Sequence, residues 1–79
     1  MSLLVKLSAS LRNLIENYDP ANGLIVSPMA NETAASLCKR LGIELNLVKI
    51  IMVNGEIKGK DTLLKDGDRV AFFPPVGGG

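Results

Sequence analysis

The final residues of the sequence carry its clearest chemical feature. Pro74 and Pro75 precede Val76 and a run of three glycines, Gly77 to Gly79. Proline has no amide hydrogen to donate and fixes φ, so this segment cannot extend a β-sheet and makes a stiff exit from the domain. Glycines carry no side chain, so their backbone can enter a channel too narrow for any Cβ, although ordering it costs conformational entropy. The pattern predicts a tail that another protein grips.

Other reactive side chains are sparse, because the sequence has no histidine and a single cysteine, Cys38. This excludes Cys/His zinc sites, iron–sulfur ligand sets, a disulfide within the chain and a histidine general base. Cys38 is either a redox or persulfide-accepting thiol or a small core residue, and its place on the apolar side of a predicted helix favours the core. Residues 66–68 (Asp-Gly-Asp) lack the spaced oxygen ligands of a calcium loop, so we interpret them as a tight turn and expect no metal site.

Length and composition indicate one small domain. The chain has 79 residues, which is too short for a second domain. Of these residues 47% are apolar and 22% charged, so the chain has enough apolar side chains to form a core. We expect the domain to span residues 1–73 and the tail to span residues 74–79. The nine basic and eight acidic residues are interleaved, which disfavours nucleic-acid binding. The longest apolar stretch, residues 45–53, is far shorter than a bilayer span, so we expect a cytoplasmic protein that does not enter membranes.

Apolar alternation and turn residues predict the strands that position the tail. A half-buried strand is expected over residues 3–8, with one or two helical turns following within residues 8–18. Further strands are expected at residues 24–26, 47–53, 56–58 and 69–73. Asn54-Gly55 between two of these strands is the strongest short signal for a β-hairpin.

One helix is expected from about Thr33 to Leu41. Asn31 or Thr33 can serve as its N-cap, and Gly42 is placed to end it. The resulting element order is β, β, α, β, short β, β, which predicts an α+β domain.

Several motifs run over nearly the whole chain and together resemble one family. They are Ser10-Leu11-Arg12, Thr33 with Leu37 and Leu41-Gly42, Val53-Asn54-Gly55-Glu56, Leu64-Lys65-Asp66-Gly67-Asp68-Arg69-Val70, and Phe73-Pro74-Pro75-Val76 with the terminal glycines. The set resembles the MoaD/ThiS family of bacterial sulfur carriers, and the Phe-Pro-Pro ending and long first connector resemble MoaD, the small subunit of molybdopterin synthase. The resemblance implies a ubiquitin-like β-grasp fold: a mixed sheet of four to five strands packed on one main helix, with a flexible Gly-Gly tail.

The resemblance also implies a chemistry for the tail. In this family the reacting group is the terminal carboxylate, here that of Gly79. An ATP-using enzyme of the MoeB or ThiF type is expected to adenylate it, after which a sulfur donor converts it to a thiocarboxylate. A MoaE-like large subunit or another sulfur acceptor would then receive the sulfur. The activating partner uses the ATP and the sulfur donor, so we expect no cofactor in this chain, which is a cosubstrate and not an enzyme.

We expect Gly77 and Gly78 to thread the partner's channel, with Val76 anchored at its mouth. A partner-binding surface is expected beside the tail. Alternation in the last strand assigns Val70 and Phe72 to the core. The predicted surface consists of Ala71, Phe73, Pro75, Ile51 and Val53.

That surface has two open points. A one-residue shift in the register of strand 47–53 would replace Ile51 and Val53 by Ile50 and Met52. Phe73 has an alternative role, because the tail or the first connector can cover an outward aromatic side chain. The nearby basic residues alternate with acids, which indicates a mixed solvated surface that could also steer an acidic partner. These basic residues are Lys58, Lys60, Lys65 and Arg69.

Molybdopterin synthesis is the leading functional prediction, and three alternatives remain open. Ser8 occupies a position where MoaD-like sequences usually have an aromatic, so the sulfur acceptor can instead belong to thiazole, tRNA nucleoside or cysteine synthesis. A ubiquitin-like modifier would use the same activation to form isopeptide bonds. A non-covalent β-grasp binding module would make no use of the tail.

Overall fold

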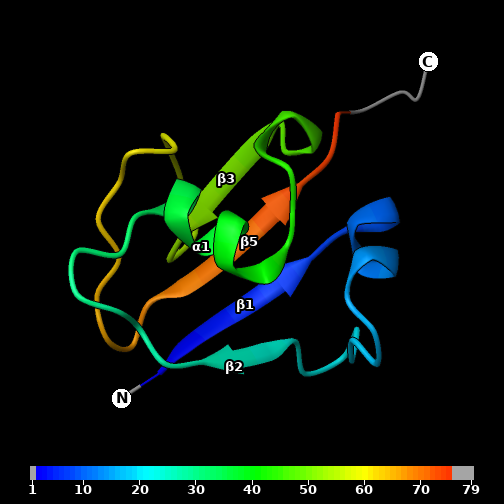
Figure 1. The fold of residues 1–79 in the computed structure, drawn as a ribbon, viewed down its shortest axis with the longest axis horizontal. Helices are drawn as coiled ribbons and strands as arrows, with labels where there is room; N and C mark the ends of the chain where they lie inside the picture. Colours follow the sequence, from blue (N-terminus) through cyan, green and yellow to red (C-terminus); the bar gives the residue numbers. More distant parts are fainter. Residues whose placement is uncertain (1, 76–79) are drawn as a thin grey trace.

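The described part of the chain, residues 2–75, forms a five-stranded sheet in the computed structural model (Figure 1). Its strands are β1 (Leu3–Leu7), β2 (Leu24–Val26), β3 (Ile50–Val53), β4 (Glu56–Lys58) and β5 (Arg69–Phe73). They lie in the order β2-β1-β5-β3-β4, with β5 parallel to β1 and antiparallel to β3. The mixed sheet and the predicted order of elements are confirmed.

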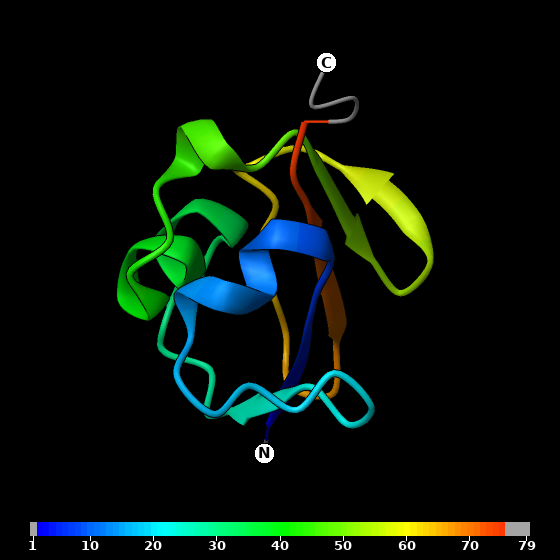
Figure 2. The same ribbon diagram turned by 90° about the vertical axis from the view of Figure 1, so that its right-hand side faces the viewer.

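The helical elements pack on one side of this sheet. They are η1 (Ala9–Leu14) and η2 (Leu45–Leu47), both 3₁₀ helices, and the α-helix α1 (Ala34–Leu41). Figure 2 shows α1 to one side of the central strands. Leu11 of η1 and Leu37 of α1 are both buried in the same core. The sheet therefore has a covered face and an outer face.

Helix α1 begins and ends with recognisable caps. Thr33 Oγ1 accepts a hydrogen bond of 3.0 Å from the Ser36 amide, and Ser36 Oγ accepts one of 2.9 Å from the Thr33 amide. This reciprocal pair is a capping box, so Thr33 and not Asn31 is the N-cap. Gly42 follows the helix with φ of 79°, a left-handed conformation in which glycine has no steric cost.

The core lies between the covered face and α1. Phe72 and the β1 residues Leu3 and Val5 are fully buried. They alternate with residues that point to the outer face, as the sequence predicted. Cys38 is 1% exposed, which confirms its place in the core.

The strand expected over residues 47–53 is only partly present. Residues 45–47 form η2 instead, because the Val48 amide donates to the Leu45 carbonyl at 3.0 Å and closes a tight turn. Leu45 and Val48 both pack against the core. Their three-residue separation fits a 3₁₀ turn, which places i and i+3 on the same side.

Candidate functional site

The root of the tail is fixed at the centre of the sheet. The Phe73 carbonyl accepts a 2.7 Å hydrogen bond from the Lys49 amide, and the Phe72 carbonyl accepts a 3.2 Å bond from the Ser8 amide. Strand β5 is thus held on both sides up to its last residue. Pro74 is half-buried and Pro75 is exposed. The chain leaves the sheet at these prolines, and their missing amide hydrogens end the ladder.

The tail residues themselves lie outside the described part of the chain. These are Val76, Gly77, Gly78 and Gly79. Their roles in threading a channel and in carrying the reacting carboxylate therefore stay predictions.

An apolar patch covers the outer face of the sheet beside the tail root. Ala71 lies opposite Met52, and Phe73 lies opposite Ile50. Ile57 on the edge strand β4 also lies opposite Met52 and is 71% exposed. Residues opposite each other on neighbouring strands share a face. We call Ile50, Met52, Ile57, Ala71 and Phe73 the outer patch.

The outer patch confirms one part of the predicted surface and corrects another. Ala71 and Phe73 do point away from the core, whereas Ile51 and Val53 are buried, each with 6% exposure. The reason is register, because Ile51 lies opposite the core residue Phe72. The one-residue alternative, with Ile50 and Met52 on the outer face, is the correct one.

Sequence reasoning missed Ile57 as a member of the patch. The Asn54-Gly55 turn could have placed Ile57 beside Met52. In the structure Asn54 and Gly55 form a two-residue turn with φ of 53° and 86°. Such a turn fixes Val53 opposite Glu56, and this in turn sets Ile57 opposite Met52.

The groups with shifted pKa values lie away from the outer patch. Burial raises the pKa of the Cys38 thiol to about 11, so at neutral pH it is a protonated core residue. Hydrogen bonds from the Lys65 amide and from Asn54 lower the pKa of Asp68 in the turn before β5. Among residues 2–75 no cluster of side chains is suited to hold a metal ion.

Comparison with protein families decides the identity of the chain. The model of the ThiS family matches residues 5–79, nearly the whole sequence. The chain belongs to the ThiS family. Members of this family and the related MoaD proteins are small sulfur-carrier subunits and not catalysts themselves. No helix within residues 2–75 has the length and apolar character of a membrane span.

Solved structures agree with this assignment. SAMP1 from Haloferax volcanii has a TM-score of 0.71 and 22% identity, with 100% of both chains covered. The HVO 2177 protein of the same organism has a TM-score of 0.75 and 24% identity, covering 100% of this chain and 87% of that one. A chain in the complex of subunits 1 and 2 of molybdopterin-converting factor from Helicobacter pylori has a TM-score of 0.59 and 25% identity, with 100% of both chains covered. Curated protein sequences give no match. The ubiquitin-like β-grasp fold of this sulfur carrier is thereby confirmed.

Proposed function

We propose that the carboxylate of Gly79 is adenylated by a MoeB- or ThiF-type enzyme, becomes a thiocarboxylate and donates its sulfur in molybdopterin synthesis. The observation that carries the proposal is that the glycine run follows the central strand β5 in the sequence, and that the root of this tail lies beside the outer patch, in a chain of the ThiS family. A partner that docks on the patch is placed to receive the tail.

The chemistry requires activation because a carboxylate oxygen is a poor leaving group. Attack of a carboxylate oxygen on the α-phosphorus of ATP releases pyrophosphate and forms an acyl-adenylate. A sulfur donor then displaces AMP, and the product thiocarboxylate is a soft nucleophile at neutral pH. In this proposal the side chains that assist these steps belong to the partners, so a chain without histidine can still take part. Because glycines carry no side chain, the tail can pass through a narrow channel and bring its carboxylate into the active sites of the partners.

A pterin acceptor is favoured by two features. Phe73-Pro74-Pro75 resembles the ending of MoaD sequences, and the Helicobacter pylori relative is in a complex of the two subunits of molybdopterin-converting factor. An exposed apolar patch of this kind marks a protein interface. We propose that a MoaE-like large subunit occupies it when sulfur is delivered.

Intact mass tests the activation step. The chain is incubated with ATP, a MoeB-type enzyme and a sulfur source, beside a variant that lacks Gly78 and Gly79. The full chain is expected to gain the mass that corresponds to replacement of one oxygen by sulfur, and the shortened chain is expected to stay unchanged. Failure of several MoeB- and ThiF-type enzymes to adenylate the full chain would overturn the proposal and favour a binding module.

A second assay decides the acceptor. The thiocarboxylated chain is mixed with a MoaE-like subunit and the sulfur-free pterin precursor, and formation of the dithiolene product is measured. Absence of product, together with sulfur transfer to a thiazole precursor, a tRNA or a cysteine precursor, would reassign the pathway. Higher-mass protein conjugates that require Gly78 and Gly79 would indicate a ubiquitin-like modifier.

A further inference from the structure

A groove separate from the outer patch runs along the covered side of the β3–β4 edge. It has a volume of about 470 Å³ and lies between η2 with the residues after it and the segment that leaves β4. Leu45, Val48 and Ile51 form its apolar floor. Ile51 is buried, and the other two pack against the core, so the floor is held in place.

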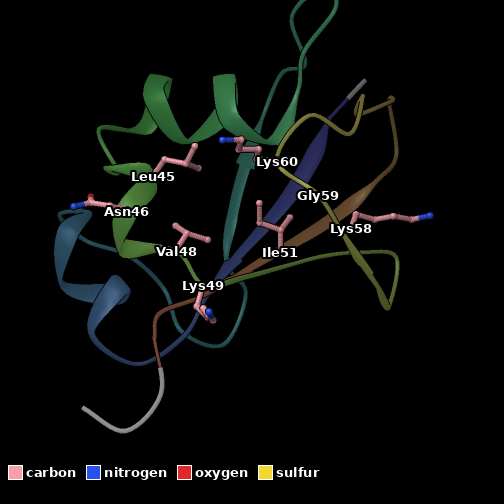
Figure 3. Close-up of a pocket in the computed structure, with 8 residues that line it drawn as sticks. All are labelled: Leu45, Asn46, Val48, Lys49, Ile51, Lys58, Gly59 and Lys60. Carbon is pink, nitrogen blue, oxygen red and sulfur yellow. The ribbon is translucent and has the colours of Figure 1, made fainter. Parts of the chain in front are cut away.

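Three lysines line the groove around this floor. Figure 3 shows Lys49 and Lys60 on opposite sides of Val48 and Ile51, whereas Lys58 extends away from them. Lys58 pairs with Glu56 at 3.3 Å, but Lys49 and Lys60 make no ion pair within residues 2–75. The groove thus presents two free ammonium groups with apolar surface between them.

The backbone holds both lysines at fixed places. The Ala35 amide at the start of α1 donates to the Lys60 carbonyl at 2.9 Å, and the Lys49 amide donates to the Phe73 carbonyl at 2.7 Å. The second bond makes one end of the groove continuous with the tail root. A protein that receives the tail therefore passes close to Lys49.

We propose that the groove binds an acidic peptide segment with a central apolar side chain, supplied by the activating enzyme that takes the tail. Carboxylates on both sides of the apolar residue complement Lys49 and Lys60, and the apolar residue covers Val48 and Ile51. The groove is shallow and open, so it suits a segment of a larger partner more than a small molecule, which needs enclosure. The identity of the partner rests on the proposed function, whereas binding of an acidic segment does not.

Titration of the ¹⁵N-labelled chain with the peptide acetyl-Asp-Glu-Leu-Asp-Glu-amide tests the groove directly. Amide shifts are expected in residues 45–49 and 58–60, with saturation. The double variant Lys49→Gln/Lys60→Gln is expected to weaken binding by about three- to tenfold at low salt. The matched variant Lys39→Gln/Lys65→Gln carries the same net charge but changes lysines outside the groove, and it should bind as the parent does. Equal weakening in both variants, or shifts spread over all lysines, would overturn the proposal.

Kinetics with the activating enzyme test whether this enzyme is the partner that binds the groove. Lys49→Gln/Lys60→Gln is expected to raise the KM for the carrier by a similar factor and to leave kcat unchanged, because the tail is intact. An unchanged KM, with peptide binding retained in the titration, would overturn the assignment to the activating enzyme. If no enzyme activates the tail, the proposed function fails, and the peptide titration still decides whether the groove is a binding site.

Discussion

The thiol of Cys38 lies in the core with 1% exposure, and burial raises its pKa to about 11. Because burial raises the pKa of this thiol from 9.0 to about 11, the folded chain has about a hundredfold less thiolate at neutral pH, and the thiolate is the reactive form. We therefore expect iodoacetamide to alkylate the folded chain at least about a hundredfold more slowly than the urea-unfolded chain, measured by intact mass. Comparable rates would contradict the core assignment. Cys38→Ala should still accept sulfur at its tail.

Glu32 is a second buried residue, and it links the β2–α1 connection to α1. Its side chain accepts hydrogen bonds from Ser36 Oγ at 2.5 Å and from Arg40 Nη2 at 2.6 Å, and the Met29 amide donates to it at 3.3 Å. Burial by itself raises the pKa of Glu32, but the bonds from Ser36 and Arg40 outweigh it, so the pKa is lowered. The ionised carboxylate is therefore the form that stabilises the fold.

This lowered pKa predicts a pH dependence of stability. The unfolded carboxyl, with a pKa of about 4.3, takes up its proton before the folded one does, so the stabilisation is complete at neutral pH. It is lost as the pH falls from about 4.3 through the lower folded pKa. Glu32→Gln should cost about 1–3 kcal/mol at pH 7, because Arg40 loses its ion pair and keeps only its hydrogen bond to the Ser27 carbonyl, and should flatten the loss of stability on acidification. Urea unfolding between neutral and acidic pH measures both effects, and an unchanged pH profile would contradict them. Asp19 and Asp68, whose pKa values are also lowered, account for a residual slope.

At the scale of elements, the β3–β4 hairpin is tied to the turn before β5 by one side chain. Asn54 Nδ2 donates to Asp68 Oδ1 at 2.9 Å, and Asn54 Oδ1 accepts from the Arg69 amide at 2.9 Å. Asn54 also has φ of 53°, a left-handed conformation that asparagine tolerates better than most residues. Asn54 thus combines the left-handed conformation of the turn with two side-chain hydrogen bonds to residues 68 and 69, which add to the β3–β5 ladder.

Two substitutions separate these contributions of Asn54. Asn54→Gly keeps the positive φ without strain and loses only the side-chain hydrogen bonds, so it should cost about 1–2 kcal/mol. Asn54→Ala adds the strain of a left-handed alanine and should cost about 1 kcal/mol more. Urea unfolding monitored by circular dichroism gives both values. Equal costs would show that the backbone conformation does not matter at this position.

The same hairpin shows what the sequence can and cannot predict. Local signals worked: alternation in β1 and β5, the capping of α1 by Thr33 and the Asn54-Gly55 turn are all present as expected. The link from Asn54 to Asp68 spans 14 residues, and no local pattern indicates which distant carboxylate an amide will meet.

For the candidate site too, the parts that depend on local alternation were predicted correctly and the parts that depend on strand pairing were not. The outward direction of Ala71 and Phe73 follows from alternation within one strand. The face of Ile51 and Val53 depended on register between strands, which an apolar stretch interrupted by η2 does not specify. The hairpin turn pairs Ile51 with Lys58 and Val53 with Glu56, but this pairing does not say which face of the sheet is covered.

At the scale of the whole molecule, the outer face of the sheet carries one exposed isoleucine at each of its two edges. Ile57 at the β4 edge and Ile25 at the β2 edge both lie on the outer face and are 71% and 73% exposed. Ile57 belongs to the outer patch beside the tail root, whereas Ile25 lies opposite Leu4, at the opposite edge of the same face. These two residues differ in position but hardly in chemistry or exposure.

Ile57→Ser and Ile25→Ser therefore form a matched test of the outer patch. Both substitutions should change the free energy of unfolding by no more than about 1 kcal/mol, because both side chains are exposed. If the activating enzyme docks on the patch, Ile57→Ser removes apolar contact area and should raise the KM for the carrier by about fivefold. Its kcat should stay unchanged, because the tail still reaches the active site. Ile25→Ser should leave both constants at the parent values. An equal rise in KM for the two variants would show that docking is not specific to the part of the outer face beside the tail root. No rise in KM for either variant would show that the enzyme docks on another surface.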